Sequence, residues 1–415
     1  MRLLTALIPN SLGKLIALGG MVVALSSCGQ SDAAETQNKQ TVNQKNISVP
    51  SQAWGRVDAS PINYNIEVVA DKIDHPWSLM FLPEGGMLLT ERGGLLKHMN
   101  DDGVISLVKD FSDIEGAPVH TKSRGQAGLF DIALHPDFIN NRQIFISYAA
   151  KVGKGLNTLV IRRFTYDADG KLDEGEQIFA ANPPRKESNH YGGRMVFPGD
   201  GTLMIPHGEA YNKREQAQVL DNHFGKILRI NLDGTIPQDN PFVDEEGALP
   251  EIWSYGHRNP QGIILGADGQ IYENEHGPKG GDEINIIERG VNYGWPAATY
   301  GIDYSGAVIS PFQTLPNMRQ SLVHFIPSIA PSGMVQYSGG AFPELKGDLL
   351  LPALAAKHVR HVEMKVDGTL GEQREMFGEL NARIRDVEIS PEGYIYLLLE
   401  ERNGPNGKIL RAVPK

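Results

Sequence analysis

The chain has 415 residues, of which 40% are hydrophobic and 21% are charged, so it is long enough to bury a large core. Its formal net charge of −11, without any run of basic residues, argues against a nucleic-acid partner. Its single cysteine excludes an intramolecular disulfide, a cysteine zinc cluster and a C-x-x-C-H haem attachment.

The N-terminal residues predict export and attachment to lipid. Arg2 and Lys14 precede the apolar stretch LIALGGMVVAL, which is far shorter than the roughly 20 residues of a membrane-spanning helix. We therefore predict a removed signal peptide over residues 1–27. The stretch ends in LSSC, similar to a bacterial lipobox, so we expect a lipid on Cys28 that anchors the chain to a membrane on its periplasmic side. Gly29 after this cysteine favours the outer membrane, and the alternative is a plain secretory signal with a chance cysteine.

Residues 28–60 are polar and nearly free of large apolar side chains. Such a segment cannot bury enough surface to offset the entropy lost on ordering, so we predict a flexible tether. The alternative is a polar edge of the folded domain.

Beyond the tether one pattern returns six times: an apolar alternating strand, a turn with Gly, Pro or Asp, and a second apolar strand. Each unit is typical of a β-hairpin, and no long segment has the spacing of an amphipathic helix. The units cover residues 77–94, 129–149, 193–209, 261–277, 333–354 and 385–401.

Six returns of one hairpin predict an all-β fold, a six-bladed β-propeller over residues 61–415. A long β-sandwich with irregular loops is the alternative. In a propeller, loops from all blades meet at the central channel, so residues far apart in the sequence can form one site.

Five loop regions carry more polar and glycine residues than ordinary turns require. Taken alone, each has a structural explanation, since a loop histidine is usually a surface residue and glycines can simply shape a connection. The regions lie around Gln126, around His190, around Arg258 and Asn259, over residues 273–296, and around Lys357 together with Arg383 and Arg385.

Together, and in this order, these regions resemble the soluble aldose sugar dehydrogenases that use pyrroloquinoline quinone (PQQ), relatives of soluble quinoprotein glucose dehydrogenase. The resemblance runs from about Asn65 to the C-terminus. Its most specific part is EIWSYGHRNPQG followed by NEHGPKGGDEINIIERGVNYGWP. It implies an oxidoreductase that takes an aldose as substrate and passes electrons to an external acceptor.

PQQ carries three carboxylates and an ortho-quinone, so its site needs cations and hydrogen-bond donors. The resemblance implies that Arg258 lies against the quinone. Arginine suits carboxylates because its planar guanidinium donates in a bidentate fork. The residues that the family pattern assigns to the carboxylates are Lys357, Arg383 and Arg385, and those that it places elsewhere around the cofactor are Gln126, Asn259 and Tyr304.

The resemblance also implies calcium. One Ca²⁺ would join the cofactor to the backbone carbonyls of Gly277 and Pro278, and Ca²⁺ prefers oxygen ligands in a flexible shell. A second, structural Ca²⁺ would bind the Glu283 carboxylate and the Tyr293 carbonyl, with Asp282 as a further candidate ligand.

By the same resemblance His190 is the catalytic base, which takes the proton of the anomeric hydroxyl while the C1 hydride moves to the quinone and a lactone forms. Gly192 and Gly193 would keep the loop low enough for a sugar to reach the imidazole. The chain departs from soluble glucose dehydrogenase at Asn189, where that enzyme has an aspartate. This difference leaves open whether His190 has a carboxylate partner. Shorter loops place the chain nearer the aldose sugar dehydrogenases, so strict glucose specificity is not implied.

Two other classes of function stay open at this point. A calcium-dependent, lactonase-like hydrolase would share the fold, although it would need several acidic side chains around one catalytic calcium. A lipid-anchored propeller that only binds carbohydrate or protein would lack the set of cofactor residues.

Overall fold

The computed structural model describes residues 52–53 (backbone only), 57–113, 125–401 and 405–415, which belong to one compact unit, Ile47–Lys415. The predicted signal peptide, Cys28 and most of the predicted tether lie outside the described residues. Among the described residues, no helix is long and apolar enough to cross a membrane.

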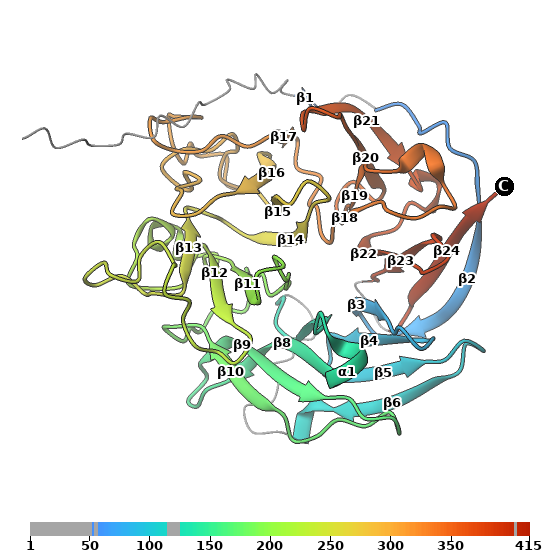
Figure 1. Cartoon of the computed structure of the whole chain (residues 1–415). Helices are drawn as coiled ribbons and strands as arrows, with labels where there is room; N and C mark the ends of the chain where they lie inside the picture. Colours follow the sequence, from blue (N-terminus) through green and yellow to red (C-terminus); the bar gives the residue numbers. More distant parts are fainter. Residues whose placement is uncertain (1–51, 54–56, 114–124, 402–404) are drawn as a thin grey trace, which may run out of the picture. The chain divides into compact units, whose positions relative to one another are not determined.

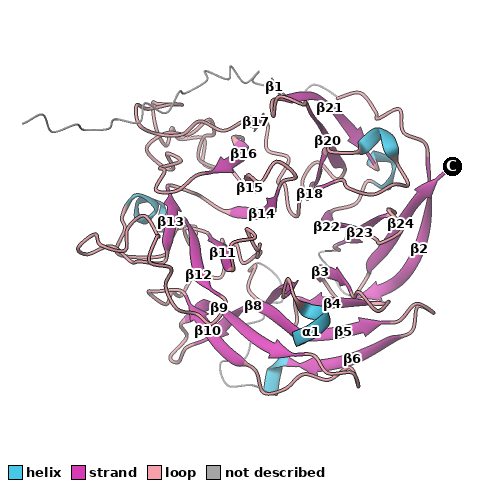
Figure 2. Cartoon of the chain, in the orientation of Figure 1, coloured by secondary structure: helices cyan, strands magenta, loops and turns pink. Residues whose placement is uncertain are grey.

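Six β-sheets stand side by side around a central axis, which confirms the six-bladed propeller (Figure 1). Helices in the described part are a single turn of α-helix and four short 3₁₀ segments, and the rest is strand and loop (Figure 2). These are α1 (Phe138–Asn141), η1 (Phe111–Asp113), η2 (Arg214–Gln218), η3 (Pro343–Leu345) and η4 (Gly378–Leu380).

Blades 1 to 3 follow one another along the chain, each built from antiparallel strands. Blade 3 has three regular strands, and a bridge between Val196 and Met204 adds its innermost strand. The strands are β3 (Pro76–Phe81), β4 (Met87–Glu91), β5 (Leu95–Met99) and β6 (Ile105–Asp110) in blade 1, β7 (Leu129–Leu134), β8 (Gln143–Lys151), β9 (Asn157–Thr165) and β10 (Glu176–Ala180) in blade 2, and β11 (Thr202–His207), β12 (Lys226–Asn231) and β13 (Ile252–Tyr255) in blade 3.

Blade 6 closes the ring, because the N-terminal strand β2 (Tyr64–Ile73) pairs with the C-terminal strand β24 (Gly407–Pro414). The other strands are β14 (Pro260–Leu265), β15 (Ile271–Glu275), β16 (Asp282–Ile287) and β17 (Val323–Ile326) in blade 4, β18 (Val335–Gln336), β19 (Leu349–Pro352), β20 (Val359–Met364) and β21 (Leu370–Met376) in blade 5, and β22 (Ile384–Ile389) and β23 (Ile395–Leu399) in blade 6.

The end of the predicted tether contacts the propeller. Strand β1 (Gln52–Ala53) pairs in parallel with β17, and Ala59 forms a bridge with Glu375. Backbone amides that pair with a strand edge are ordered by it, so these residues depart from the expectation of a flexible tether up to residue 60.

The core consists of six apolar clusters, one between each pair of neighbouring blades. One cluster joins blade 3 to blade 4 through Met204 and Ile227 on one side and Ile263 and Ile271 on the other. Another joins blade 6 to blade 1 and so seals the ring. Because every sheet buries both faces against its neighbours, the loops at the strand ends are left to carry the chemistry.

Candidate active site

The predicted loops converge on one face of the propeller. This face, here called the site face, is formed by the loops between the second and third strands of each blade and by the connections from one blade to the next. A cavity of about 270 Å³ opens there between Glu209, Arg258, Pro278 and Tyr304.

His190 lies on the connection between β10 and the innermost strand of blade 3, and its side chain is buried, with the residue 5% exposed. Its backbone N–H donates to Oε1 of Gln126 over 2.7 Å, which joins two predicted site residues. The turn needs glycine, because Gly192 has φ +67° and a Cβ there would lie 2.4 Å from the carbonyl oxygen of Pro206. The glycines therefore bring the chain close to β11 and fix the place of the imidazole.

Glu209 is the carboxylate partner of His190, which settles the question that Asn189 raised. Its Oε1 lies 3.2 Å from Nδ1 of the imidazole. Burial, followed by the charges of Arg258 and Arg185, lowers the pKa of His190 well below its usual range, so the imidazole is neutral at pH 7. Burial raises the pKa of Glu209 to about 7, although the two arginines oppose this shift. Nothing in the local sequence of Glu209 marks it, since only the fold brings the end of β11 beside residue 190.

Arg258 lies at the wall of the cavity, on the loop between β13 and β14. Nη1 of its guanidinium donates to the carbonyl oxygen of Gly277 over 2.6 Å, and the group lies over the rings of Trp295 and Tyr304. Its backbone N–H donates to Oε2 of Glu275 over 2.5 Å. The loop that holds Arg258 is thus tied to the loop of the predicted calcium ligands.

Asn259 follows Arg258 and is fully buried. Its backbone N–H also reaches Oε2 of Glu275, over 3.2 Å, and its carbonyl accepts the N–H of His276 over 3.1 Å. The side-chain amide lies 3.4 Å from Nδ1 of His276. Asn259 therefore lies buried next to Arg258 and is tied to the same loop, although it does not line the cavity itself.

A cluster of arginines surrounds Glu400 elsewhere on the site face. Arg385 donates to its Oε2 over 3.1 Å and 2.5 Å, and Arg383 over 3.4 Å. Arg92 lies 3.8 Å from its Oε1. Although Glu400 is buried, the arginines lower its pKa to about 2. Three guanidinium groups thus share one carboxylate, and the cluster keeps an excess of positive charge.

The arginine cluster and the base belong to one network. Arg92 donates to the carbonyl of Gly125, next to Gln126, which in turn holds the backbone of His190. The sequence analysis did not identify Arg92 and Glu400. Arg92 follows β4 and Glu400 follows β23, so the two residues are far apart in the sequence and only the fold brings them together. Lys357 is exposed on the β19–β20 loop of the same face and donates to Asn381, in the segment before β22.

The predicted metal ligands fall into two groups. Gly277 and Pro278 lie at the cavity, where the carbonyl of Gly277 faces Arg258 and Pro278 forms part of the wall. Glu283 lies further along, at the start of β16, and its Oε2 is 3.4 Å from Nδ2 of Asn285. Tyr293 is buried, and its backbone N–H donates to the carbonyl of Tyr255 over 2.8 Å.

Asp282, the further candidate calcium ligand, supports the Gly277 loop through hydrogen bonds. Its carboxylate accepts the N–H of Gly277 over 2.9 Å, the N–H of Ala330 over 2.7 Å and the hydroxyl of Ser328 over 2.7 Å. These donors occupy both oxygens, and burial raises the pKa of the carboxyl to about 6. Asp282 therefore holds the Gly277 loop from behind.

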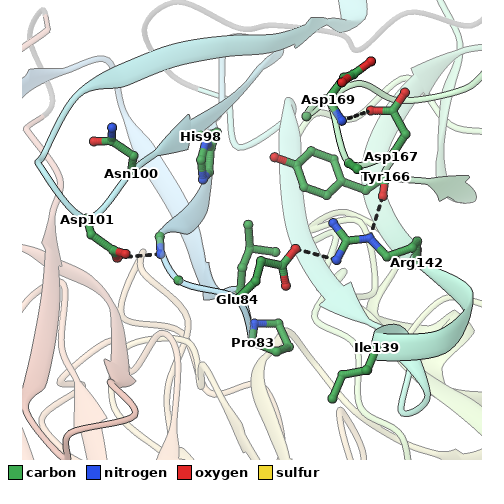
Figure 3. A pocket seen from close by; sticks show the side chains of 15 residues that line it. Pro83, Glu84, His98, Asn100, Asp101, Ile139, Arg142, Tyr166, Asp167 and Asp169 are labelled. Carbon is green, nitrogen blue, oxygen red and sulfur yellow. Dashed lines mark hydrogen bonds and ion pairs between the residues drawn. The ribbon is translucent and has the colours of Figure 1, made fainter.

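A larger cavity of about 790 Å³ lies on the opposite face, between the turns of blades 1 and 2 (Figure 3). Glu84 and Arg142 form an ion pair across it, and Asp101 accepts the N–H of Gly86 at its edge. It contains none of the predicted site residues. Asp167 caps its own turn by accepting the N–H groups of Asp169 and Lys171.

Comparison with known proteins agrees with this arrangement. The family described as Glucose / Sorbosone dehydrogenase matches residues 73–411. The chain is 40% identical to the aldose sugar dehydrogenase YliI of Escherichia coli, over 89% of this chain and 97% of that protein. A crystal structure of the soluble aldose sugar dehydrogenase of Escherichia coli in its apo form has a TM-score of 0.79 and 39% identity, covering 85% of this chain and 100% of that one. The PQQ-bound aldose sugar dehydrogenase of Streptomyces coelicolor, 24% identical with a TM-score of 0.68, shares the fold over 86% of this chain and 99% of its own.

Proposed function

The chain belongs to the glucose/sorbosone dehydrogenase family of oxidoreductases, and we propose that it oxidises the C1 hydroxyl of aldose sugars to lactones with PQQ and calcium. The observation that carries this proposal is that the neutral, buried imidazole of His190 and the arginine cluster around Glu400 lie on one face, connected through Gln126 and Gly125. Electrons would pass from the reduced cofactor to an external acceptor.

The arginine cluster fits the carboxylates of PQQ. Arg92, Arg383 and Arg385 outnumber Glu400, so an anion that binds there meets net positive charge. Hydrogen bonds between arginine and a carboxylate are stronger than those between neutral groups, and two neighbouring arginines can bind different carboxylates of one ligand. This charge also argues against the hydrolase alternative, which requires an acidic metal site at the channel mouth.

A calcium ion requires oxygen ligands. Gly277 offers its carbonyl beside Arg258, and Pro278 forms part of the same wall, so both fit a calcium ion held by the main chain. Glu283 accepts a weak bond from an amide and has no Lys or Arg among its bonded partners in the described part of the chain, so its carboxylate fits a second calcium.

His190 performs the proton transfer. With Glu209 ionised, Nδ1–H of the imidazole donates to the carboxylate, and Nε2 keeps a lone pair that accepts the proton of the anomeric hydroxyl. Bound PQQ supplies the acceptor for the C1 hydride. Arg258 adds positive charge where negative charge grows during the reaction.

Optical spectroscopy tests the proposal. Purified chain is mixed with PQQ and Ca²⁺, and its absorption spectrum is followed before and after glucose or another aldose is added. We expect PQQ to bind and then to be reduced by the sugar, while EDTA before mixing prevents assembly and added Ca²⁺ restores it. A spectrum that no aldose changes would contradict sugar oxidation, and full activity after exhaustive chelation would contradict the calcium.

We further propose that Cys28 carries a lipid that keeps the enzyme on the periplasmic side of the outer membrane. This rests on the LSSC stretch after a short apolar segment. Cys28→Ala should move the protein from the detergent phase to the aqueous phase on phase separation. Equal partitioning of the variant and the native chain would contradict the lipid on Cys28.

A further inference from the structure

A buried group of metal-ligating side chains lies inside blade 4, behind the candidate active site. His257, Glu273 and Glu275 each offer a ligand atom, and these atoms lie within 4.8 Å of one another. The two glutamates are 0% and 4% exposed, and His257 is 0% exposed. In the antiparallel register, Glu273 faces Asn285 and Glu275 faces Glu283, so all four side chains lie on one side of the β15–β16 pair.

The two glutamates have no Lys or Arg counter-charge within the described part of the chain. Among the described residues, no Lys or Arg side chain bonds to Glu273 or Glu275, and one amide, Nδ2 of Asn285, lies 3.1 Å and 3.5 Å from their oxygens. Burying a carboxylate without a counter-charge is costly, and two beside each other also repel. Burial and the charge of Glu275 accordingly raise the pKa of Glu273 well above its usual range.

A second observation points to a ligand. Oε1 of Glu273 is buried and has no hydrogen-bond partner among the described residues. Buried polar atoms are nearly always bonded, so this acceptor, beside two further ligand atoms, indicates where a cation would bind.

His257 is oriented as a metal ligand would be. Its Nε2 lies 2.9 Å from Oγ of Ser254, and its Nδ1 lies 3.3 Å from Oε1 of Glu275. With the proton on Nε2 donated to Ser254, Nδ1 presents its lone pair toward the two carboxylates. A hydrogen bond from the far nitrogen commonly fixes a ligating histidine in this way.

We propose that His257, Glu273 and Glu275 bind a divalent cation inside blade 4. One nitrogen and several carboxylate oxygens form a mixed donor set, which suits Mn²⁺ or Zn²⁺ better than Mg²⁺. The site adjoins the second calcium position, because Glu275 faces Glu283 across the β15–β16 pair. It differs from both calcium positions in its ligands, since it uses neither Glu283, nor the Gly277 loop, nor the carbonyl of Tyr293.

The cation also reaches the active-site loop. Oε2 of Glu275 accepts the backbone N–H groups of Arg258 and Asn259, while its Oε1 faces His257. A cation on Oε1 would lock the rotamer of Glu275 and with it the backbone that carries Arg258.

Metal counting on the chain without PQQ tests the proposal independently of sugar oxidation. Protein stripped with EDTA is dialysed against Mn²⁺, and bound manganese is measured by mass spectrometry. Glu273→Gln keeps the shape of the side chain and should bind one equivalent fewer than the native chain. Glu388→Gln removes a half-buried carboxylate in β22, outside blade 4, and should match the native chain.

Pulsed electron paramagnetic resonance on the native chain gives a second readout that needs no variant. Bound Mn²⁺ should couple to a directly coordinated ¹⁴N, that of His257, whereas both calcium positions offer oxygen alone. Equal manganese counts for the native chain and Glu273→Gln, or a native spectrum without nitrogen coupling, would overturn the proposal.

Discussion

His190 combines the properties that a general base requires. Its imidazole is neutral, its Nδ1 lies against Glu209, and its backbone is fixed by Gln126 at φ +55°. Arg185 also donates to the carbonyl of His190 over 3.0 Å and lies 3.8 Å from the centre of the Tyr191 ring. The residue is therefore held from both sides, and among the described residues Nε2 has no hydrogen-bond partner, so this nitrogen can face the substrate.

Replacement of the base should remove turnover and spare the cofactor. His190→Asn suits the left-handed backbone at this position because asparagine tolerates positive φ, and it has no basic nitrogen. We expect reduction of bound PQQ by excess aldose to slow by roughly 10²- to 10⁴-fold in stopped-flow measurements. Affinity for PQQ should change little, and a variant that reduces at the native rate would contradict the role of His190.

The pair of His190 and Glu209 predicts a pH dependence with a definite sign. Because the pKa of Glu209 lies at about 7, lower pH protonates this carboxyl, which then donates to Nδ1 and leaves the proton of the imidazole on Nε2. Nε2 can then no longer accept a proton, so kcat/KM should fall as pH drops through about 7.

Glu209→Gln is the matched variant, since its amide cannot titrate. We expect a lower kcat/KM and no inflection near neutral pH. An inflection that persists in the variant would assign the titration to another group.

At the scale of elements, the cation cluster is made by the start of β22 and the end of β23. Arg383 and Arg385 flank Ile384, and Glu400 follows β23, so antiparallel pairing brings them together. Successive strand residues point to opposite faces, so residues two apart point the same way. The arginines therefore reach Glu400 together.

Arg383→Ala should weaken the binding of PQQ without harming the chemistry. Arg385 still pairs with Glu400, so the fold should tolerate the change. A hydrogen bond to a charged group contributes about 1.5–3 kcal/mol, so the Kd for PQQ should rise roughly ten- to hundredfold. Titration of PQQ followed by fluorescence measures this, and Arg411→Ala, on the outer strand β24, is the control. An unchanged Kd for PQQ in Arg383→Ala would contradict the proposal that the arginine cluster binds the cofactor.

At the scale of the whole molecule, Arg194 joins blades across the central channel. It donates to Asp131 of blade 2 over 3.1 Å, and to Asp386 of blade 6 over 3.0 Å and 2.7 Å. Its guanidinium also lies 4.3 Å from the centre of the Trp77 ring of blade 1. The arginine after the glycine pair is thus structural, unlike the histidine before it.

Arg194→Met should destabilise the propeller strongly, because it leaves two buried carboxylates without their partner. Removing one side of a buried ion pair costs about 3–5 kcal/mol. The matched change Arg411→Met breaks an exposed pair with Glu67, and such pairs contribute about 0–1 kcal/mol. Urea unfolding measures both free energies. Similar losses for the two variants would contradict the role of Arg194.

Local patterns in the sequence predicted the hairpins and most of the candidate site. Alternating apolar residues with glycine turns define a strand pair from neighbours alone, so the six units appear as β3–β4, β7–β8, β14–β15, β18–β19, β22–β23 and the inner pair of blade 3. The motif of residues 273–296 is equally local. Its resemblance to a known family placed Arg258 and Gly277 together, and the structure brings them within 2.6 Å.

The tertiary structure alone decided which residues become partners across the ring. Glu209 beside His190, and Arg92 beside Glu400, are pairs between loops far apart in the sequence, and neither partner carries a local sign of the other. The blade 4 cluster likewise depends on register, because a shift of one residue would turn Glu273 and Glu275 to the opposite face. Periodicity fixes which side of a strand is buried, whereas the charge that a buried group meets is set by the strands and loops packed against it.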